Sequence, residues 1–85
     1  MLEAYKLTKV EIKLELQGIM RDAFDDDNLV IVDETNADDV EAWNSLSHIN
    51  LILAVESNFG IKFRTIEIEN MTNVRDLVDA IERKI

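Results

Sequence analysis

Hydrophobic residues recur at helical spacing in three segments of the chain, and each segment predicts a helix. The first opens at Thr8 with Glu11 three residues later, a capping-box pattern, and extends to Phe24. Its expected buried face is Val10, Leu14, Met20 and Phe24. Residues 10–16 also alternate apolar with charged side chains, as in a half-buried strand. Strong helix formers fill the segment and no hairpin turn follows it, so the helix is favoured.

The second helix is predicted over residues 45–59, with Asn44 as its N-cap and Gly60 as its C-terminal stop. One side of this helix is apolar and consists of Leu46, Ile49, Ile52 and Leu53. The alternation in residues 61–71 fits either a strand or a short helix, and the short helix is favoured. The last helix starts near Thr72 or Asn73 and ends at Arg83 and Lys84, because cations suit a helix C-terminus.

Residues 25–44 form a long predicted loop that is rich in acidic side chains. Loops of this length are uncommon in a small domain and are usually either functional or disordered. The apolar side chains available to anchor the loop against the helices are Leu29, Ile31, Val40 and Trp43. The remaining core is expected from Leu46, Ile49, Leu53, Phe59, Ile61, Met71, Val74, Leu77 and Ile81.

Composition limits the class of protein. The 85 residues are predicted to form one domain, 1–85, and a hydrophobic fraction of 47% favours a folded chain over an acidic disordered one. Nine Lys and Arg against eighteen Asp and Glu give a net charge of −9, which repels nucleic acids and anionic membranes and favours basic partners. With no cysteine and no continuous apolar stretch near the N-terminus, we expect a cytoplasmic monomer without membrane insertion.

Candidate chemistry is concentrated at Ser45, which opens the second helix directly after the acidic loop. A serine in this place is usually only a cap. Its hydroxyl can also accept a transferred group, because it is exposed and a helix N-terminus favours an incoming phosphate. No nucleophile, base and orienting group can be assembled into an enzyme site, and the Asp-rich residues 25–28 lack the Gly and Glu of a calcium loop, so no metal site is expected.

Residues 38–52 resemble the attachment-site segment of acyl carrier proteins, whose hallmark is Asp-Ser-Leu at the start of the second helix. The resemblance continues through the Phe-Gly-Ile turn at residues 59–61 and the final helix from residue 71, so that it covers residues 38–82. The sequence departs from the family pattern at Asn44, where the family has Asp.

This resemblance implies an all-α four-helix bundle with a long loop between the first two helices and a short third helix. It implies that a phosphopantetheinyl transferase attaches 4'-phosphopantetheine from coenzyme A to Ser45, flanked by Asn44 and Leu46. The carrier, not itself an enzyme, then delivers thioester-bound acyl groups to acyl-activating, condensing or acyltransferase enzymes of fatty acid, polyketide or specialised lipid biosynthesis. A carrier of aminoacyl or peptidyl groups, and an unmodified helical interaction module suggested by Asn44, remain alternatives.

Within the resemblance, six carboxylates form an expected docking face for basic partner enzymes: Asp38, Asp39, Glu41, Glu56, Glu67 and Glu69. For any one of them, a solvated surface position is the simpler interpretation. His48 is expected to lie at the surface or in a partner contact, because a carrier needs no base of its own. Ser47 is expected to point away from Ser45 and not to act as an acceptor.

Overall fold

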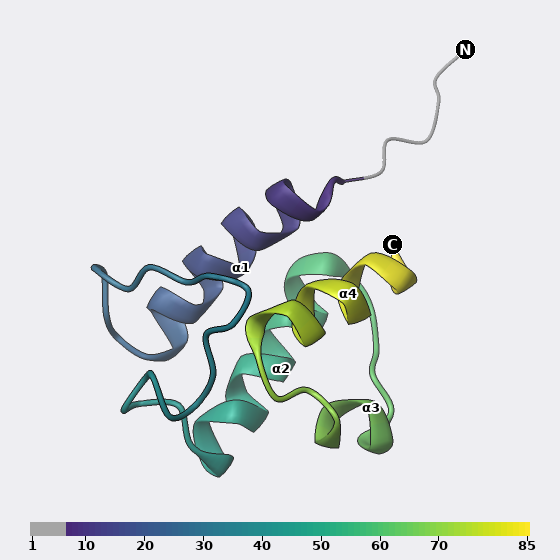
Figure 1. Ribbon diagram of the computed structural model, residues 1–85. Helices are drawn as coiled ribbons and strands as arrows, with labels where there is room; N and C mark the ends of the chain where they lie inside the picture. Colours follow the sequence, from purple (N-terminus) through teal and green to yellow (C-terminus); the bar gives the residue numbers. More distant parts are fainter. Residues whose placement is uncertain (1–6) are drawn as a thin grey trace.

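The computed structural model describes residues 7–85, which fold into four helices (Figure 1). These helices are α1 (Lys9–Ala23), α2 (Ser45–Phe59), α3 (Thr65–Glu69) and α4 (Val74–Lys84). Over the described part of the chain no strand forms, and one isolated bridge joins Asn36 to Asn73. The predicted all-α, four-helix architecture with a long first loop and a short third helix is confirmed. Part of the N-terminal segment inspected for a signal sequence, residues 1–6, lies outside the described residues.

Local capping determines where the helices begin and end. The backbone N–H of Thr8 donates to Glu11 Oε1 at 2.8 Å, and the N–H of Glu11 donates back to Thr8 Oγ1 at 3.2 Å, so the predicted capping box of α1 is confirmed. Asn73 caps α4 by accepting the N–H of Asp76 at 2.9 Å. Gly60 ends α2 with φ of 67°, a left-handed conformation that glycine adopts without strain.

The core lies where α1 packs against α2 and α4. Its fully buried side chains come from these three helices: Ile12, Leu16, Met20, Leu51, Ile52, Val55, Val74, Leu77 and Ile81. The predictions that Phe24, Ile61 and Met71 are buried are confirmed, and Phe59 is partly buried against the same cluster.

The predicted buried faces of α1 and α2 were partly wrong. Val10 and Leu14 are 65% and 64% exposed, and α1 instead buries Ile12 and Leu16. Each of these segments carries apolar residues on more than one side, and helical periodicity does not state which side faces the other helices.

On α2 the error concerns the residues nearest Ser45. Leu46, Ile49 and Leu53 are 76%, 48% and 57% exposed and do not belong to the core. The helix packs through Leu51, Ile52 and Val55 instead. The three exposed side chains recur at spacings of three and four and therefore form one stripe along α2, which we call the α2 apolar stripe.

The loop between α1 and α2 is fastened along α1 by three side chains of that helix. Arg21 Nε donates to the carbonyl of Leu29 at 2.7 Å, Gln17 Oε1 accepts the N–H of Ile31 at 3.0 Å, and Lys13 Nζ pairs with Asp33 at 2.7 Å. The expected anchors of this loop are buried or packed against the core: Leu29, Ile31, Val40 and Trp43. The loop thereby has a defined path to the start of α2.

The start of α4 depends on an ionised Asp76. Its Oδ2 accepts the backbone N–H of Thr72 at 3.0 Å and the Thr72 hydroxyl at 2.9 Å, and the pKa of Asp76 is lowered, chiefly by the backbone hydrogen bond. The pKa of Asp76 is lower in the folded than in the unfolded state, so the ionised carboxylate stabilises the fold. This stabilisation is complete at pH values above the unfolded-state pKa and is lost as the pH falls through the folded-state pKa.

We predict that Asp76→Ala lowers the free energy of unfolding at pH 7 by about 1 kcal/mol, the usual net worth of such hydrogen bonds. Below about pH 4, where the unfolded chain takes up a proton on Asp76, the difference from the parent protein should begin to shrink, and it should shrink further as the pH falls toward the lowered folded pKa of Asp76. Denaturant titrations at pH 7 and pH 3 measure this, with Asp27→Ala as an exposed control. An equal difference at both pH values would contradict the assignment.

Candidate functional site

Asn44 caps α2 and leaves Ser45 as its first residue. Asn44 Oδ1 accepts the N–H groups of Leu46 and Ser47, both at 3.0 Å, so the predicted cap is confirmed. Ser47 completes the capping box, because its Oγ accepts the N–H of Asn44 at 2.8 Å and donates to the carbonyl of Ala42 at 2.6 Å. The two hydroxyls near the helix start therefore have different surroundings.

Ser45 is exposed, and its hydroxyl makes no hydrogen bond with any residue in the described range. Ser47, in contrast, is held by three hydrogen bonds within the cap. The Ser45 hydroxyl is therefore available to react with a group that approaches the start of α2, whereas the Ser47 hydroxyl is hydrogen-bonded within the cap. The expectation that Ser47 does not present itself as an acceptor agrees with this arrangement.

An open groove of about 730 Å³ runs beside Ser45, between the start of α2 and the segment that joins α3 to α4. One side is contributed by the loop and α2, including Asp38, Ser45 and His48. The other side is contributed mainly by Ile68, Glu69, Met71, Thr72 and Asn73. Apolar and acidic side chains share the lining, so the groove suits an elongated group with both apolar and polar parts.

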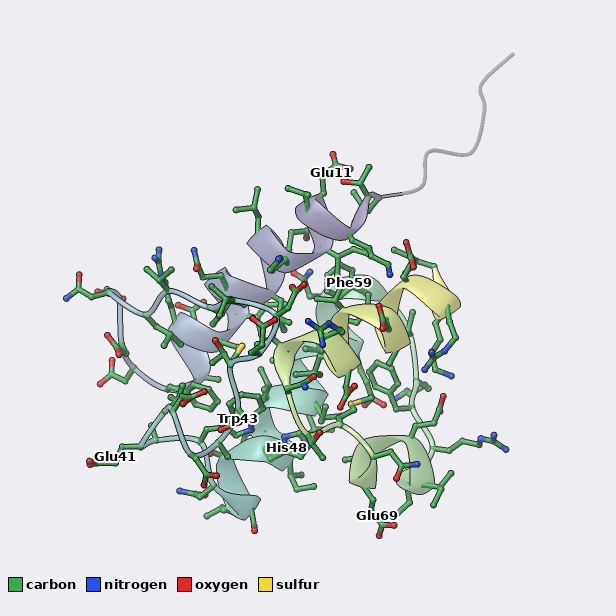
Figure 2. All side chains as sticks on the ribbon, in the orientation of Figure 1. Glu11, Glu41, Trp43, His48, Phe59 and Glu69 are labelled. Carbon is green, nitrogen blue, oxygen red and sulfur yellow. The ribbon has the colours of Figure 1, made fainter. Side chains whose placement is uncertain are left out.

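Trp43 and His48 form a pair at the floor of this site, and Figure 2 shows them side by side at the start of α2. Trp43 is 4% exposed, packs against Phe24 at 5.9 Å between ring centroids, and donates its Nε1–H to His48 Nδ1 at 3.0 Å. The two rings stack at 6.1 Å and 22°. The sequence placed His48 at the surface or in a partner contact and did not reveal this internal hydrogen bond. The sequence hints at this bond only through the presence of Trp43 just before α2 and His48 just inside it.

The predicted docking carboxylates divide into two groups. Asp38, Asp39, Glu41 and Glu69 are exposed, and Asp38 and Glu69 line the groove beside Ser45. In Figure 2, Glu41 extends outward at the left of the molecule and Glu69 at the bottom. Of these four, only Asp39 makes a side-chain hydrogen bond with another residue in the range 7–85, accepting the N–H of Asn36 at 3.1 Å.

Glu56 and Glu67 hold the segment between α2 and α3 in place. Glu56 Oε2 accepts the N–H of Phe63 at 2.8 Å. Glu67 Oε1 accepts the N–H of Arg64 at 2.7 Å and pairs with Lys84 at 3.2 Å, and the pKa of Glu67 is lowered, first by the backbone hydrogen bond. Both side chains are half-buried and could therefore still contact a partner protein. Each, however, also stabilises the fold through a hydrogen bond from a backbone N–H.

Across residues 7–85, no group of three or more His, Cys, Asp or Glu side chains is arranged to hold a metal ion. None of the helices in this range is long and apolar enough to cross a membrane.

Comparison with known proteins extends the likeness over nearly the whole chain, although no protein-family model matches it. The acyl carrier protein of Cyanidium caldarium is 34% identical over 80 residues, which cover 93% of this chain and 92% of that protein. The acyl carrier protein of Thermosynechococcus vestitus is 31% identical over 80 residues, covering 93% and 98%. That of Thermotoga maritima is 27% identical over 78 residues.

The fold agrees with these sequences. The solution structure of the holo acyl carrier protein from Geobacter metallireducens superposes on the chain with a TM-score of 0.81 and 44% sequence identity, covering 86% of this chain and 84% of that one. Similarity above 30% over almost all of both sequences, together with the shared four-helix fold, shows common descent. The chain belongs to the acyl carrier protein family.

Proposed function

We propose that Ser45 carries 4'-phosphopantetheine and that the chain delivers acyl groups, bound to that arm as thioesters, to separate enzymes of acyl metabolism. The observation that carries the proposal is the free, exposed hydroxyl of Ser45 at the first position of α2, at the mouth of a groove. This serine also matches the attachment serine in the family's Asp-Ser-Leu motif.

The residues around Ser45 fit such a group. The positive end of the α2 dipole favours a phosphate on Ser45, and Asn44 places no carboxylate beside it. When the arm is bound, its terminal thiol supplies the nucleophile that forms thioesters. The protein's own contribution is to hold the attachment atom at a rigid helix start and to tether the cargo, which raises its local concentration toward the millimolar range at a docked enzyme.

Partner recognition follows from the surface around Ser45. The exposed carboxylates beside the groove attract basic side chains, and the α2 apolar stripe supplies area for a close contact. We propose that the phosphopantetheinyl transferase and the acyl-activating, condensing or acyltransferase enzymes share this surface, in fatty acid, polyketide or specialised lipid biosynthesis.

The test is incubation of the purified chain with coenzyme A and a broad-specificity phosphopantetheinyl transferase, followed by intact-protein mass spectrometry. We expect a mass increase of one phosphopantetheine group, located on Ser45 by peptide mapping. An unchanged mass under conditions that load a reference carrier would refute the proposal and favour the unmodified interaction module.

Asn44 gives a second, smaller prediction. If the family's aspartate pairs with a basic residue of the transferase, Asn44→Asp should raise the loading rate by up to about fivefold at low salt, as expected for an exposed ion pair. The cap should persist because Asp is an equally good N-cap. Loading rates at several salt concentrations test this, with Asn50→Asp as a control that adds the same charge on an exposed face of α2 outside the groove. A rate that is independent of the Asn44 substitution at all salt concentrations would exclude the ion pair.

A further inference from the structure

The hydrogen bond between Trp43 and His48 defines the protonation pattern of the imidazole. An indole Nε1–H can only donate, so His48 Nδ1, at 3.0 Å from it, must be the accepting nitrogen. A neutral imidazole that accepts at Nδ1 carries its proton on Nε2. Because Trp43 is buried and packed against Phe24, the donor that imposes this tautomer is itself held in place.

The place of His48 on α2 brings its ring near Ser45. Helical side chains lean toward the N-terminus, and His48 follows Ser45 by three residues, so its ring leans over the turn that contains Ser45. Its partner Trp43 precedes Ser45, in agreement with this direction of the side chain. His48 and Ser45 line the same groove, and His48 Nε2 has no hydrogen-bond partner among residues 7–85.

The His48 Nε2–H is a relevant donor for a phosphate on Ser45 because the groove is lined by acidic rather than basic side chains. Asp38 and Glu69 line the groove, whereas none of its lining residues is Lys or Arg. A phosphate on Ser45 therefore has no cationic side chain in the lining and must be stabilised by neutral donors. Several are already engaged: the Trp43 indole donates to His48, and the Thr72 hydroxyl donates to Asp76. The His48 Nε2–H has no hydrogen-bond partner among residues 7–85, its ring belongs to a residue one turn from Ser45, and its tautomer is set by the bond from Trp43.

We propose that His48 is a positioning residue for the prosthetic group: its Nε2–H, held by Trp43, donates a hydrogen bond to the phosphodiester on Ser45. This inference rests on the proposed attachment at Ser45 and adds to it a role for a residue outside the Asp-Ser-Leu motif. The bond orients the first atoms of the arm toward the groove, because it fixes the phosphate on the side of the helix where His48 lies.

The first experiment uses the unloaded protein. Long-range ¹H–¹⁵N spectra at pH 8.5, where an ordinary imidazole is neutral, should show His48 as the Nε2–H tautomer. In Trp43→Phe, which keeps an aromatic ring against Phe24 but removes the indole donor, the tautomers should mix. A dominant Nδ1–H tautomer in the unmodified chain overturns the proposal.

The second experiment compares unloaded and loaded protein, with loading verified by mass spectrometry. A hydrogen bond to an anion should slow exchange of the His48 Nε2 proton by about tenfold or more on loading. It should also shift the ³¹P resonance of the phosphodiester relative to the same loaded protein unfolded in denaturant. His48→Phe should lose the ³¹P shift, His48→Gln should restore part of it, and Asn50→Ala should leave it unchanged. If the arm is attached but neither His48 exchange nor the ³¹P resonance responds, the role of His48 is wrong while the carrier function stands. If no arm attaches, both proposals fail together.

Discussion

Replacement of Ser45 by Ala is expected to abolish loading from coenzyme A while leaving the helical circular dichroism and the melting temperature unchanged. The Ser45 side chain is exposed and makes no hydrogen bond with the described residues, so its removal costs the fold almost nothing. The cap of α2 is supplied by Asn44 and Ser47, which remain.

The matched control is Ser47→Ala, two residues along the same helix. Ser47 closes the capping box, so its loss should cost about 1 kcal/mol of stability. Its hydroxyl is not the acceptor, so loading should continue on Ser45 at temperatures where the variant stays folded. The two substitutions thus separate the functional hydroxyl from the structural one.

Intact-protein mass spectrometry and thermal melts of both variants measure the outcome. Label on Ser45→Ala would move the attachment point elsewhere. A large destabilisation of Ser45→Ala would instead show that the Ser45 hydroxyl bonds to another group in the folded protein and is not available as an acceptor.

Features that depend on neighbouring residues in the chain could be predicted from the sequence, whereas features that depend on tertiary packing could not. Thr8, Asn44 and Asn73 cap residues only two or three positions away, so the starts of α1, α2 and α4 were readable from short patterns. The buried face of a helix is a property of its neighbours. Leu46 and Leu53 therefore looked like core residues, although the other helices pack on Leu51 and Val55.

The candidate site likewise has one part that could be predicted from local sequence and one part that depends on tertiary contacts. Ser45 was identified from its place at a helix start and from the family motif, both of which are continuous in sequence. The Trp43–His48 hydrogen bond and the groove wall around Glu69 depend on how the loop, α2 and α3 come together in three dimensions. Spacing along the chain does not encode these contacts, so the internal partner of the imidazole was not predicted.

The predicted docking face also changes once internal bonds are known. A test that neutralises Glu56 or Glu67 would mix two effects, because each accepts a backbone N–H that holds the segment before α3. Of the remaining four carboxylates, Asp39 is omitted because it bonds Asn36. The clean test therefore uses the exposed residues without such bonds.

We predict that the triple variant Asp38→Asn, Glu41→Gln, Glu69→Gln slows loading by the transferase about tenfold at low salt, the lower end of electrostatic steering. The second-order loading rate constant should also depend less steeply on salt, because fewer charges are left to be screened. Unfolding free energy should change by no more than about 0.5 kcal/mol, as expected for exposed positions.

A control must remove the same number of charges from elsewhere on the surface. The triple variant Asp22→Asn, Asp25→Asn, Asp27→Asn does so at exposed residues that do not line the groove and whose side chains make no hydrogen bond or ion pair with the described residues. If steering depends on where the carboxylates lie, this control should load nearly as fast as the parent protein and keep most of its salt slope. If it depends only on the net charge of −9, the two triple variants should be slowed equally. Loading at the parent rate by both variants would show that the carboxylates near Ser45 are a solvated surface, and recognition would then depend on the α2 apolar stripe, where Leu46→Ala becomes the decisive substitution.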